Sequence, residues 1–527
     1  MKNALKLLAA AVLFVAAFSC SKPAEVSLPV IFSDHMVLQR DCDANLWGGS
    51  APGARVSVQW RGKSYSAVAD EAGKWKLSVP AGEAGGPFTL KIGDKTVSDV
   101  LVGEVFICSG QSNMELPVRR CMDVVADDVK DYSNPSIRYF AVPTAYDFNG
   151  PAEDIAGGRW EVLDSEQTGL QWSAVCYFTA RYINEATGVP VGMVRPALGG
   201  SPIESWMQES ILPESAVKKL APYKVKAFTD SLKIASGKVY TEWPRKYNEL
   251  PAVTPKWSRA ELFSKSWALD AKGKPWYGGH HFRKTVNLSE SQAAGESILH
   301  LGAMVDADSV FVNGKCVGNT TYQYPPRNYT VPAGTLKTGD NLIEIHLFCY
   351  GDAPSSFVKD KLYSLETPDG DISLMSGWEH SYDKRMPARD KEIFLQWEPV
   401  GLYNAMVAPI RDFRSAGVIW YQGESNIGNA AEYGNLLERM IGDWRAEMSN
   451  AELPFYIIEL AAYQHSELTD NDFGWNRVQK EQRRTAEKMD GVYLIPNGDL
   501  GEWNDIHPQD KKTLGQRTAN EILKHIK

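Results

Sequence analysis

Apolar and polar residues alternate with a period of two in the first part of the chain. The stretches RVSVQWRGKSYSAVAD (55–70) and GKWKLSVPAG (73–82) show this alternation, and glycines and other turn residues separate them. Such a pattern is typical of strands that bury one face and expose the other. It predicts a small β-sandwich over residues 24–100.

Continuous apolar runs replace the alternation from about residue 101. VGEVFICSG (102–110) is typical of a strand in a sheet that is covered on both faces. AVCYFTARYINEATG has helical spacing and ends at Gly188, a residue suited to a helix C-cap. The same succession of apolar strands and amphipathic helices returns in VPVGMVRPALGG, AGVIWYQGES, LPFYIIEL, AEYGNLLERMIGDWRAEM, VYLIPNGDL and KKTLGQRTANEILKHI. It predicts a three-layer α/β domain with a parallel sheet, formed by residues 101–255 and 395–527.

A second region of β alternation interrupts this α/β pattern between residues 260 and 365. HHFRKTVNLS, DSVFVNGKCVG and NLIEIHLFCYG all read as strands. The pair Asn313-Gly314 lies between two apolar runs, which is a strong signal for a β-hairpin. The pattern therefore predicts a β-domain over 260–365 that is inserted into the α/β domain.

Composition narrows the functional classes. A chain of 527 residues is longer than one hydrophobic core usually supports. Lys and Arg total 56 against 65 Asp and Glu, and this net charge of -9 disfavours nucleic acid as a partner. The chain has no C-x-x-C spacing and no H-E-x-x-H motif among its nine histidines, so we expect no metal site. Cys108, Cys176 and Cys349 lie in apolar runs and are expected to be buried thiols.

The first twenty residues have the pattern of an export signal. MKNALKLLAAAVLFVAAFSC carries Lys2 and Lys6 before a short apolar run. The small residue before Cys20 resembles a bacterial lipobox, although Ala17 stands where leucine is usual. We expect residues 1–20 to be a lipoprotein signal peptide, with an ordinary cleaved signal as the alternative. Lipidation of Cys20 would tether an exported protein to a membrane, in the periplasm or at the cell surface.

Four polar motifs follow predicted strands, at the sheet edge where a parallel α/β fold gathers its functional loops. They supply a hydroxyl, a glycine turn, an amide and acid cluster, and a histidine beside an acid. Acyl transfer requires these parts. The motifs are Gly110-Gln111-Ser112-Asn113, Leu198-Gly199-Gly200-Ser201, Gln422-Gly423-Glu424-Ser425-Asn426 and Asn504-Asp505-Ile506-His507-Pro508.

Each motif has a possible role in such a reaction. Ser112 is expected at a helix start, where free backbone N–H groups could stabilise an oxyanion. Gly200 could offer a second N–H, and a side-chain amide from Gln422 or Asn426 would complete the hole. His507 would take the serine proton, and Asp505 would orient its ring. Each piece also has an ordinary structural role, since a serine at a strand–helix junction is usually an N-cap.

The motifs G-Q-S-N-M, G-G-S-P-I-E-S-W, W-Y-Q-G-E-S-N and D-I-H-P resemble the blocks of the SGNH (GDSL-like) hydrolase superfamily, and more narrowly its sialate O-acetylesterase branch. IFSDHMVLQR resembles that branch's N-terminal β-domain. The resemblance implies Ser112 as nucleophile, His507 as base, and Gly200 with an amide of the third block as the oxyanion hole.

Two departures from the superfamily pattern affect the site. The usual acid precedes the histidine by three residues, and that position is Asn504 here. Asp505 is therefore the expected acid, and Glu424 is the reserve candidate. The usual G-x-N-D block reads Gly423-Glu424-Ser425-Asn426, so the choice between Gln422 and Asn426 stays open.

The resemblance implies a serine esterase that removes O-acetyl groups from sialic acids without a cofactor. An acetylesterase acting on another polysaccharide, such as xylan, is one alternative. A carbohydrate-binding lipoprotein without catalytic activity is another, and it would bind sugar without turnover. The inserted domain loosely resembles the jelly rolls of glycoside hydrolases, which implies either sugar binding or a structural role. The partner in each case is a sugar or glycan, and the membrane contact is a lipid anchor only. The sequence does not indicate an oligomeric state.

Overall fold

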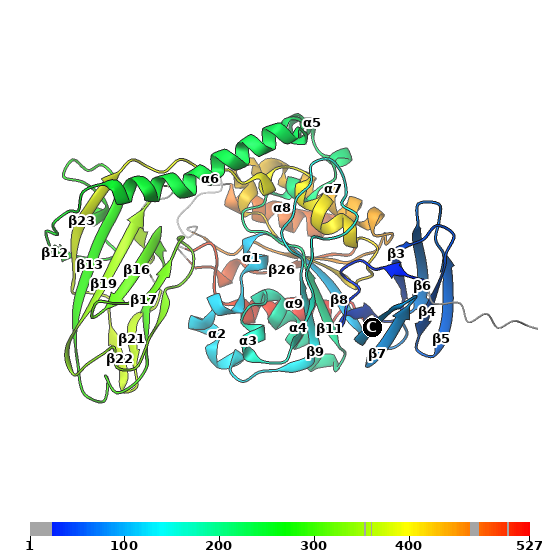
Figure 1. Ribbon diagram of the computed structural model, residues 1–527, viewed down its shortest axis with the longest axis horizontal. Coiled ribbons are helices and arrows are strands. Elements are labelled where there is room, and N and C mark those ends of the chain that lie inside the picture. The colour runs from blue at the N-terminus through cyan, green and yellow to red at the C-terminus, as the bar shows by residue number, and fades with distance from the viewer. Residues whose placement is uncertain (1–23, 352–354, 360, 464–473, 503–504, 527) are drawn as a thin grey trace, which may run out of the picture.

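The computed structural model describes residues 24–351, 355–359, 361–463, 474–502 and 505–526. Three regions follow one another along its long axis (Figure 1): a β-region at the N-terminal end, a central α/β region, and a β-region at the opposite end. The lipid-anchor prediction, including Cys20, lies outside the described residues. Within them, no helix has the length and apolarity needed to cross a membrane.

The N-terminal β-region is joined to the central sheet by one long strand. This strand, β8 (Lys95–Gly110), pairs with β7 at its start and with the central strands at its end. It therefore runs without interruption through the expected domain boundary at residues 100 and 101. The other strands of the region are β1 (Val26–Ser27), β2 (Val37–Gln39), β3 (Asp43–Ser50), β4 (Arg55–Trp60), β5 (Lys63–Val68), β6 (Lys74–Pro80) and β7 (Gly85–Ile92).

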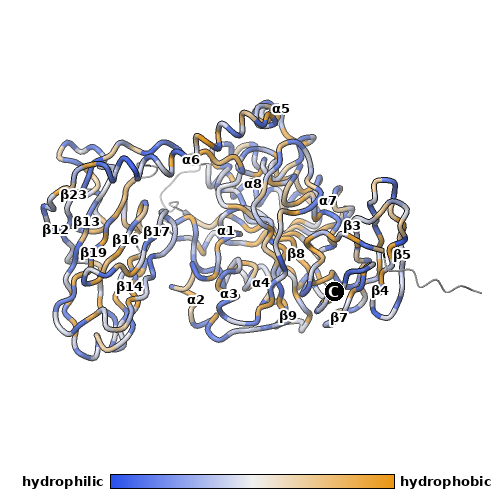
Figure 2. Tube along the Cα trace, viewed as in Figure 1, coloured by the Kyte–Doolittle hydropathy of each residue, from blue (hydrophilic) through white to orange (hydrophobic). Residues whose placement is uncertain are grey.

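The central sheet has the order β10-β9-β11-β8-β24-β25-β26. Neighbouring strands from β9 to β26 are parallel, and only β10 is antiparallel to its neighbour. Figure 2 shows hydrophobic residues concentrated along these inner strands, as expected where helices cover both faces. The strands are β9 (Asn134–Ala141), β10 (Trp160–Leu163), β11 (Val191–Arg195), β24 (Gly417–Tyr421), β25 (Phe455–Ile458) and β26 (Val492–Ile495).

Helices flank this sheet on both sides (Figure 1). On one side α4 (Ala174–Thr187) packs against α9 (Lys511–Ile522), and on the other α7 (Ala430–Glu447) packs against α8 (Trp475–Lys488). The expected helix end at Gly188 is confirmed, because this residue caps α4 with φ +69°. The remaining α-helices are α1 (Ser112–Glu115), α2 (Met122–Val129), α3 (Glu166–Gly169), α5 (Glu214–Leu220) and α6 (Lys226–Glu249).

The inserted β-domain has its own hydrophobic core, separate from the core shared by the other two regions. Its sheets have the orders β12-β23-β13-β19-β16-β17, β18-β14-β21-β22 and β15-β20. The strands are β12 (Ser258–Ala260), β13 (Tyr277–Leu288), β14 (Ser297–Leu301), β15 (Met304–Val305), β16 (Ala307–Val312), β17 (Lys315–Thr320), β18 (Asn328–Val331), β19 (Gly339–Cys349), β20 (Ser356–Phe357), β21 (Tyr363–Thr367), β22 (Gly370–Ser373) and β23 (Trp378–Met386). The domain thus extends beyond the expected limits of 260 and 365.

Two local predictions in this region and its neighbour are confirmed. Asn313 and Gly314, with φ +50° and +78°, connect β16 to β17 as a hairpin. Cys108, Cys176 and Cys349 are buried and free.

The long helix α6 leads from the central region to the inserted domain and packs there through Trp243 and Tyr247. The fold is mixed α/β, with several sheets whose strand pairs are mainly parallel in the central region and antiparallel in the inserted domain.

Candidate active site

Ser112 lies at the carboxyl end of β8, where the strand turns into the short helix α1. Gly110, the last residue of β8, has φ +138°, and a Cβ there would meet Tyr421 O at 2.1 Å. Only glycine lets the two backbones approach this closely. The Ser112 Oγ is 2.8 Å from His507 Nε2, although 395 residues separate them in sequence. The first and last of the four motifs therefore meet, and the pair has the geometry of a nucleophile and its base.

His507 is nearly fully buried, with 4 % of its surface exposed, and Asp505 lies beside it. Asp505 Oδ1 accepts a hydrogen bond of 2.8 Å from the backbone N–H of His507. The same oxygen is 3.6 Å from His507 Nδ1, which has no hydrogen-bond partner among the described residues. Burial lowers the pKa of His507 below its ordinary value, and Asp505 opposes this effect. The neutral imidazole that a general base requires is thus favoured.

Residues of the inserted β-domain contact both members of this pair. Tyr324, from the segment between β17 and β18, packs edge-to-face on His507 with ring centroids 4.8 Å apart. Lys361, just before β21, places its Nζ 2.9 Å from Asp505 Oδ2 and also contacts Glu502. Neither Tyr324 nor Lys361 belongs to a motif that the sequence singled out, and no sequence signal marks them.

The glycine turn after β11 lies next to Ser112. Gly200 has φ +76°, and a Cβ there would lie 2.0 Å from the Trp397 ring, so this position requires glycine. Trp397 Nε1 also donates to Gly199 O at 2.8 Å. The N–H of Gly199 is bound to Glu115 Oε2 at 2.8 Å, whereas that of Gly200 has no acceptor among the described residues. Gly200 is therefore the turn residue with a free donor.

The two amides expected to compete for the oxyanion hole are both engaged within the protein. Gln422 Nε2 donates to Asn426 Oδ1 at 2.7 Å, and Asn426 Nδ2 donates to Glu204 Oε2 at 2.9 Å. Gln111 Oε1 accepts a further hydrogen bond from Gln422 and others from backbone N–H groups of the same loop. All three side chains are at least 97 % buried. The amides thus fix the loop after β24 against the loop after β8.

Glu424, the reserve acid, points to Asn113 and not to the imidazole in the contacts of the described residues. Its Oε1 accepts a hydrogen bond of 2.6 Å from Asn113 Nδ2, and its other oxygen has no partner among those residues. Lys511 Nζ donates to Asn113 Oδ1 at 2.7 Å. Burial raises the pKa of Glu424 and lowers that of Lys511 to about 8. Asp505 is therefore the carboxylate beside His507.

Three arginines lie near the motifs in sequence, and their contacts differ. Arg195 donates to Tyr139 Oη at 2.6 Å and to Ala197 O, so it serves the fold. Arg119 is exposed and bound to Gln171. Arg120 differs, because its Nε is buried without a partner among the described residues and its charge acts on both Asp505 and His507.

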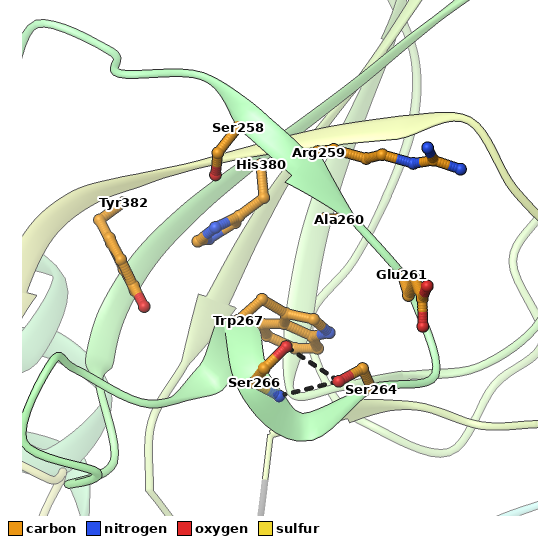
Figure 3. Close-up of a pocket in the computed structure, with 9 residues that line it drawn as sticks. All are labelled: Ser258, Arg259, Ala260, Glu261, Ser264, Ser266, Trp267, His380 and Tyr382. Atoms are coloured by element: carbon orange, nitrogen blue, oxygen red, sulfur yellow. Dashed lines mark hydrogen bonds between the residues drawn. The ribbon is translucent and has the colours of Figure 1, made fainter.

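A separate pocket of about 370 Å³ opens in the inserted domain, between β12, the turn before β13, and β23 (Figure 3). Trp267, His380 and Tyr382 form its aromatic part, and serines with Arg259 and Glu261 form its polar rim. Trp267 and His380 are buried, and none of the residues expected to do chemistry lines this pocket. Within the described ranges, no group of His, Cys, Asp and Glu residues could hold a metal ion.

Two segments of the chain, residues 102–232 and 391–524, match the family "Carbohydrate esterase, sialic acid-specific acetylesterase". They make up just over half of the sequence, contain all four motifs and flank the inserted domain. The chain belongs to this carbohydrate esterase family, which confirms the resemblance drawn from the motifs.

Particular relatives are sialate O-acetylesterases of mammals. Those of Pongo abelii and Homo sapiens are 31 % and 30 % identical over 209 and 208 residues, in each case 36 % of this chain and 40 % of the relative. The matched part thus spans about two-fifths of the relatives' length. A carbohydrate acetylesterase structure from Xanthomonas citri superposes with a TM-score of 0.56, at 23 % identity, over 94 % of this chain and 74 % of that one. That similarity extends the shared fold to nearly the whole chain.

Proposed function

We propose that this protein is a serine carbohydrate esterase that removes O-acetyl groups from sialic acids. The observation that carries the proposal is the 2.8 Å hydrogen bond between Ser112 Oγ and His507 Nε2 at the sheet's carboxyl edge. Membership of a sialic acid-specific acetylesterase family supports the substrate class. The catalytic domain is assigned to the three-layer SGNH type and the inserted domain to the jelly-roll type.

The first half-reaction forms an acetyl-enzyme. His507 Nε2 takes the proton of Ser112 as its Oγ attacks the acetyl carbonyl carbon. The N–H groups of Ser112 and Gly200 bind the oxyanion of the tetrahedral intermediate. The bond from the carbonyl carbon to the sugar oxygen then breaks, and His507 returns the proton to that oxygen, which releases the sugar as an alcohol.

The second half-reaction uses water in place of the serine. His507 takes a proton from the water as it attacks the acetyl-enzyme, and the collapse of the second intermediate returns that proton to Ser112 Oγ. Acetate leaves. Asp505 stabilises the imidazolium that forms in both halves, and its distance of 3.6 Å from Nδ1 shortens when that nitrogen becomes charged. Gln111, Asn113, Gly199, Gln422, Glu424 and Asn426 hold the loops that position these groups.

Arg120 favours a sialic acid over a neutral sugar, because the charge of this half-buried guanidinium acts on His507 and suits a carboxylate held near the imidazole. Acetylated xylan is the competing substrate. A binding protein without turnover would leave the Ser112–His507 contact without a role.

Acetate release from O-acetylated sialic acid by the mature protein and its Ser112→Ala form tests the proposal. Loss of turnover in a folded Ser112→Ala protein is expected, and activity surviving that change would contradict the mechanism. Turnover of acetylated xylan but not of sialate would keep the mechanism and change the substrate. Binding of either sugar without acetate release would favour the binding protein.

Export and anchoring are a separate part of the proposal. The signal peptide of residues 1–20 directs the chain out of the cytoplasm, and lipidated Cys20 holds it at the outer membrane. Growth of expressing cells with labelled palmitate should label the parent and not Cys20→Ala. An unlabelled parent would indicate an ordinary cleaved signal.

A further inference from the structure

Lys361 is a buried lysine that the inserted domain places against the carboxylate of the candidate active site. Its side chain is 2 % exposed, and its ammonium lies 2.9 Å from Asp505 Oδ2. It also contacts Glu502, whose Oε1 accepts the backbone N–H of Gln509 at 2.8 Å. Lysine is rarely buried to this degree unless its charge is paired. One ammonium of the inserted domain therefore joins two carboxylates that precede His507 in sequence.

The two oxygens of Asp505 have different partners. Oδ1 faces His507, through the backbone N–H at 2.8 Å and Nδ1 at 3.6 Å, while Oδ2 faces Lys361. The ammonium therefore fixes the rotation of the carboxylate and keeps Oδ1 turned to the imidazole. Burial alone would raise the pKa of Asp505, but the interactions with His507 and Lys361 hold it well below its ordinary value.

The charges of this group suit the proposed reaction. With the imidazole neutral, Lys361, Asp505 and Glu502 together carry one net negative charge; Lys361 and Asp505 are buried and Glu502 is half-buried. Formation of the imidazolium neutralises that charge, and a low effective dielectric makes such compensation stronger than in water. Removal of the lysine would leave Asp505 and Glu502 without their shared cation, and replacement of Glu502 by a neutral residue would remove the excess negative charge.

The contact between the domains is supported elsewhere in the same interface. Tyr324 packs edge-to-face on His507, with ring centroids 4.8 Å apart. Asn328, at the start of β18, donates to Asp123 Oδ1 of α2 at 2.7 Å. Gln509 Nε2 donates to the second oxygen of Asp123 at 3.3 Å. The inserted domain is thus attached to the catalytic loop at several points.

We propose that Lys361 is a positioning residue for the Asp505–His507 pair, so that the inserted β-domain completes the active site. This proposal rests on the proposed function, because it assigns Lys361 a role in the esterase reaction. It gives the inserted domain a task that is independent of the pocket in Figure 3.

Three variants test the role of Lys361 in acetate release. Lys361→Met keeps the length of the side chain and removes the charge, Lys361→Arg keeps the charge, and Lys337→Met changes an exposed lysine of the same domain as a control. We expect kcat to fall ~10- to 100-fold in Lys361→Met with KM within about twofold, as for outer-shell partners that orient a functional histidine. Lys361→Arg should recover most of kcat, and Lys337→Met should match the parent.

The pH profile separates positioning from a merely structural role. Among the described residues, the charged and titratable groups that act on His507 directly are Asp505, Arg120, Lys511 and Tyr324. Lys361 contacts Asp505, and Glu502 contacts Lys361. Lys361→Met makes this surrounding more negative, so the acidic limb of kcat/KM should move to higher pH. Glu502→Gln makes it less negative and should move the limb to lower pH. This second variant also serves if Lys361→Met does not fold.

The proposal is supported if the acidic limb moves in opposite directions in Lys361→Met and Glu502→Gln, and if the loss of activity in Lys361→Met is confined to kcat. A folded Lys361→Met protein with the parent's kcat and pH profile would overturn it, as would an unmoved limb in Glu502→Gln. Failure of the proposed function is distinguishable, since Ser112→Ala would then retain acetate release whatever Lys361 does.

Discussion

Replacement of Asn113 by alanine tests whether the serine loop is held in place by a buried polar network. Asn113 is 2 % exposed and links three elements through its side chain. Its Nδ2 donates to Glu424 at 2.6 Å and to Ile506 O at 2.7 Å, and its Oδ1 accepts from Lys511 at 2.7 Å. The substitution therefore removes a partner from one carboxylate, one ammonium and one carbonyl at once.

The expected cost follows from these three contacts. A hydrogen bond to a charged group contributes about 1.5–3 kcal/mol, and a neutral one about 1 kcal/mol. The sum is about 4–7 kcal/mol, and water entering the vacated space reduces it. We expect the free energy of unfolding to fall by about 4 kcal/mol. Because Ile506 precedes His507, we also expect kcat to fall at least ~10-fold, which is part of the ~100- to 10,000-fold that a well-positioned general base contributes.

Urea unfolding followed by tryptophan fluorescence measures the stability, and acetate release measures the activity. Asn435→Ala is the matched control, because Asn435 is exposed on α7 and its loss should change stability by less than about 0.5 kcal/mol. The inserted domain has a core of its own, so any transition that belongs to it should stay unchanged. A loss below about 1 kcal/mol with the parent's kcat would refute the reasoning.

Three further predictions follow from the site. Gly200→Ala should reduce kcat/KM ~100-fold or more, because the added Cβ would lie 2.0 Å from the Trp397 ring and φ at this position is +76°. Activity within threefold of the parent would show that the turn has no catalytic role. The acidic limb of kcat/KM should lie below pH 6.5, since burial lowers the pKa of His507 and the imidazole acts as a base only while neutral. A pH-rate profile with its acidic limb above pH 7 would contradict the lowered pKa. Arg120→Met should raise the KM for O-acetylated sialic acid ~10-fold and leave the KM for a neutral acetyl ester unchanged. An equal change in KM for both esters would show that Arg120 does not recognise the carboxylate.

The sequence determined where the candidate catalytic residues lie. In a parallel sheet every strand ends at the same edge, so motifs that follow different strands converge whatever their separation along the chain. This rule is why Ser112 and His507, 395 residues apart, are within a hydrogen bond of each other. The hairpin at Asn313-Gly314 and the helix end at Gly188 were also predictable, because each depends on the conformations that a few neighbouring residues can adopt.

Only the tertiary structure decided how the side chains in these motifs are used. The sequence left open whether Gln422 or Asn426 completes the oxyanion hole, and the structure engages both amides in hydrogen bonds with other loops. It also offered Asp505 and Glu424 as acids, and only Asp505 lies beside the imidazole. Such choices depend on the rotation of each side chain and on its partners, which residue type and spacing do not fix.

The contribution of the inserted domain was equally invisible in the sequence. Lys361 and Tyr324 belong to no motif, and they reach the site because a β-domain with its own core docks against the catalytic loops. Hydrophobic periodicity determined that this domain folds, because each strand must bury its apolar face. Where the domain docks is set by complementary surfaces and by the pairing of a buried ammonium with two carboxylates, and those contacts exist only once both domains have formed.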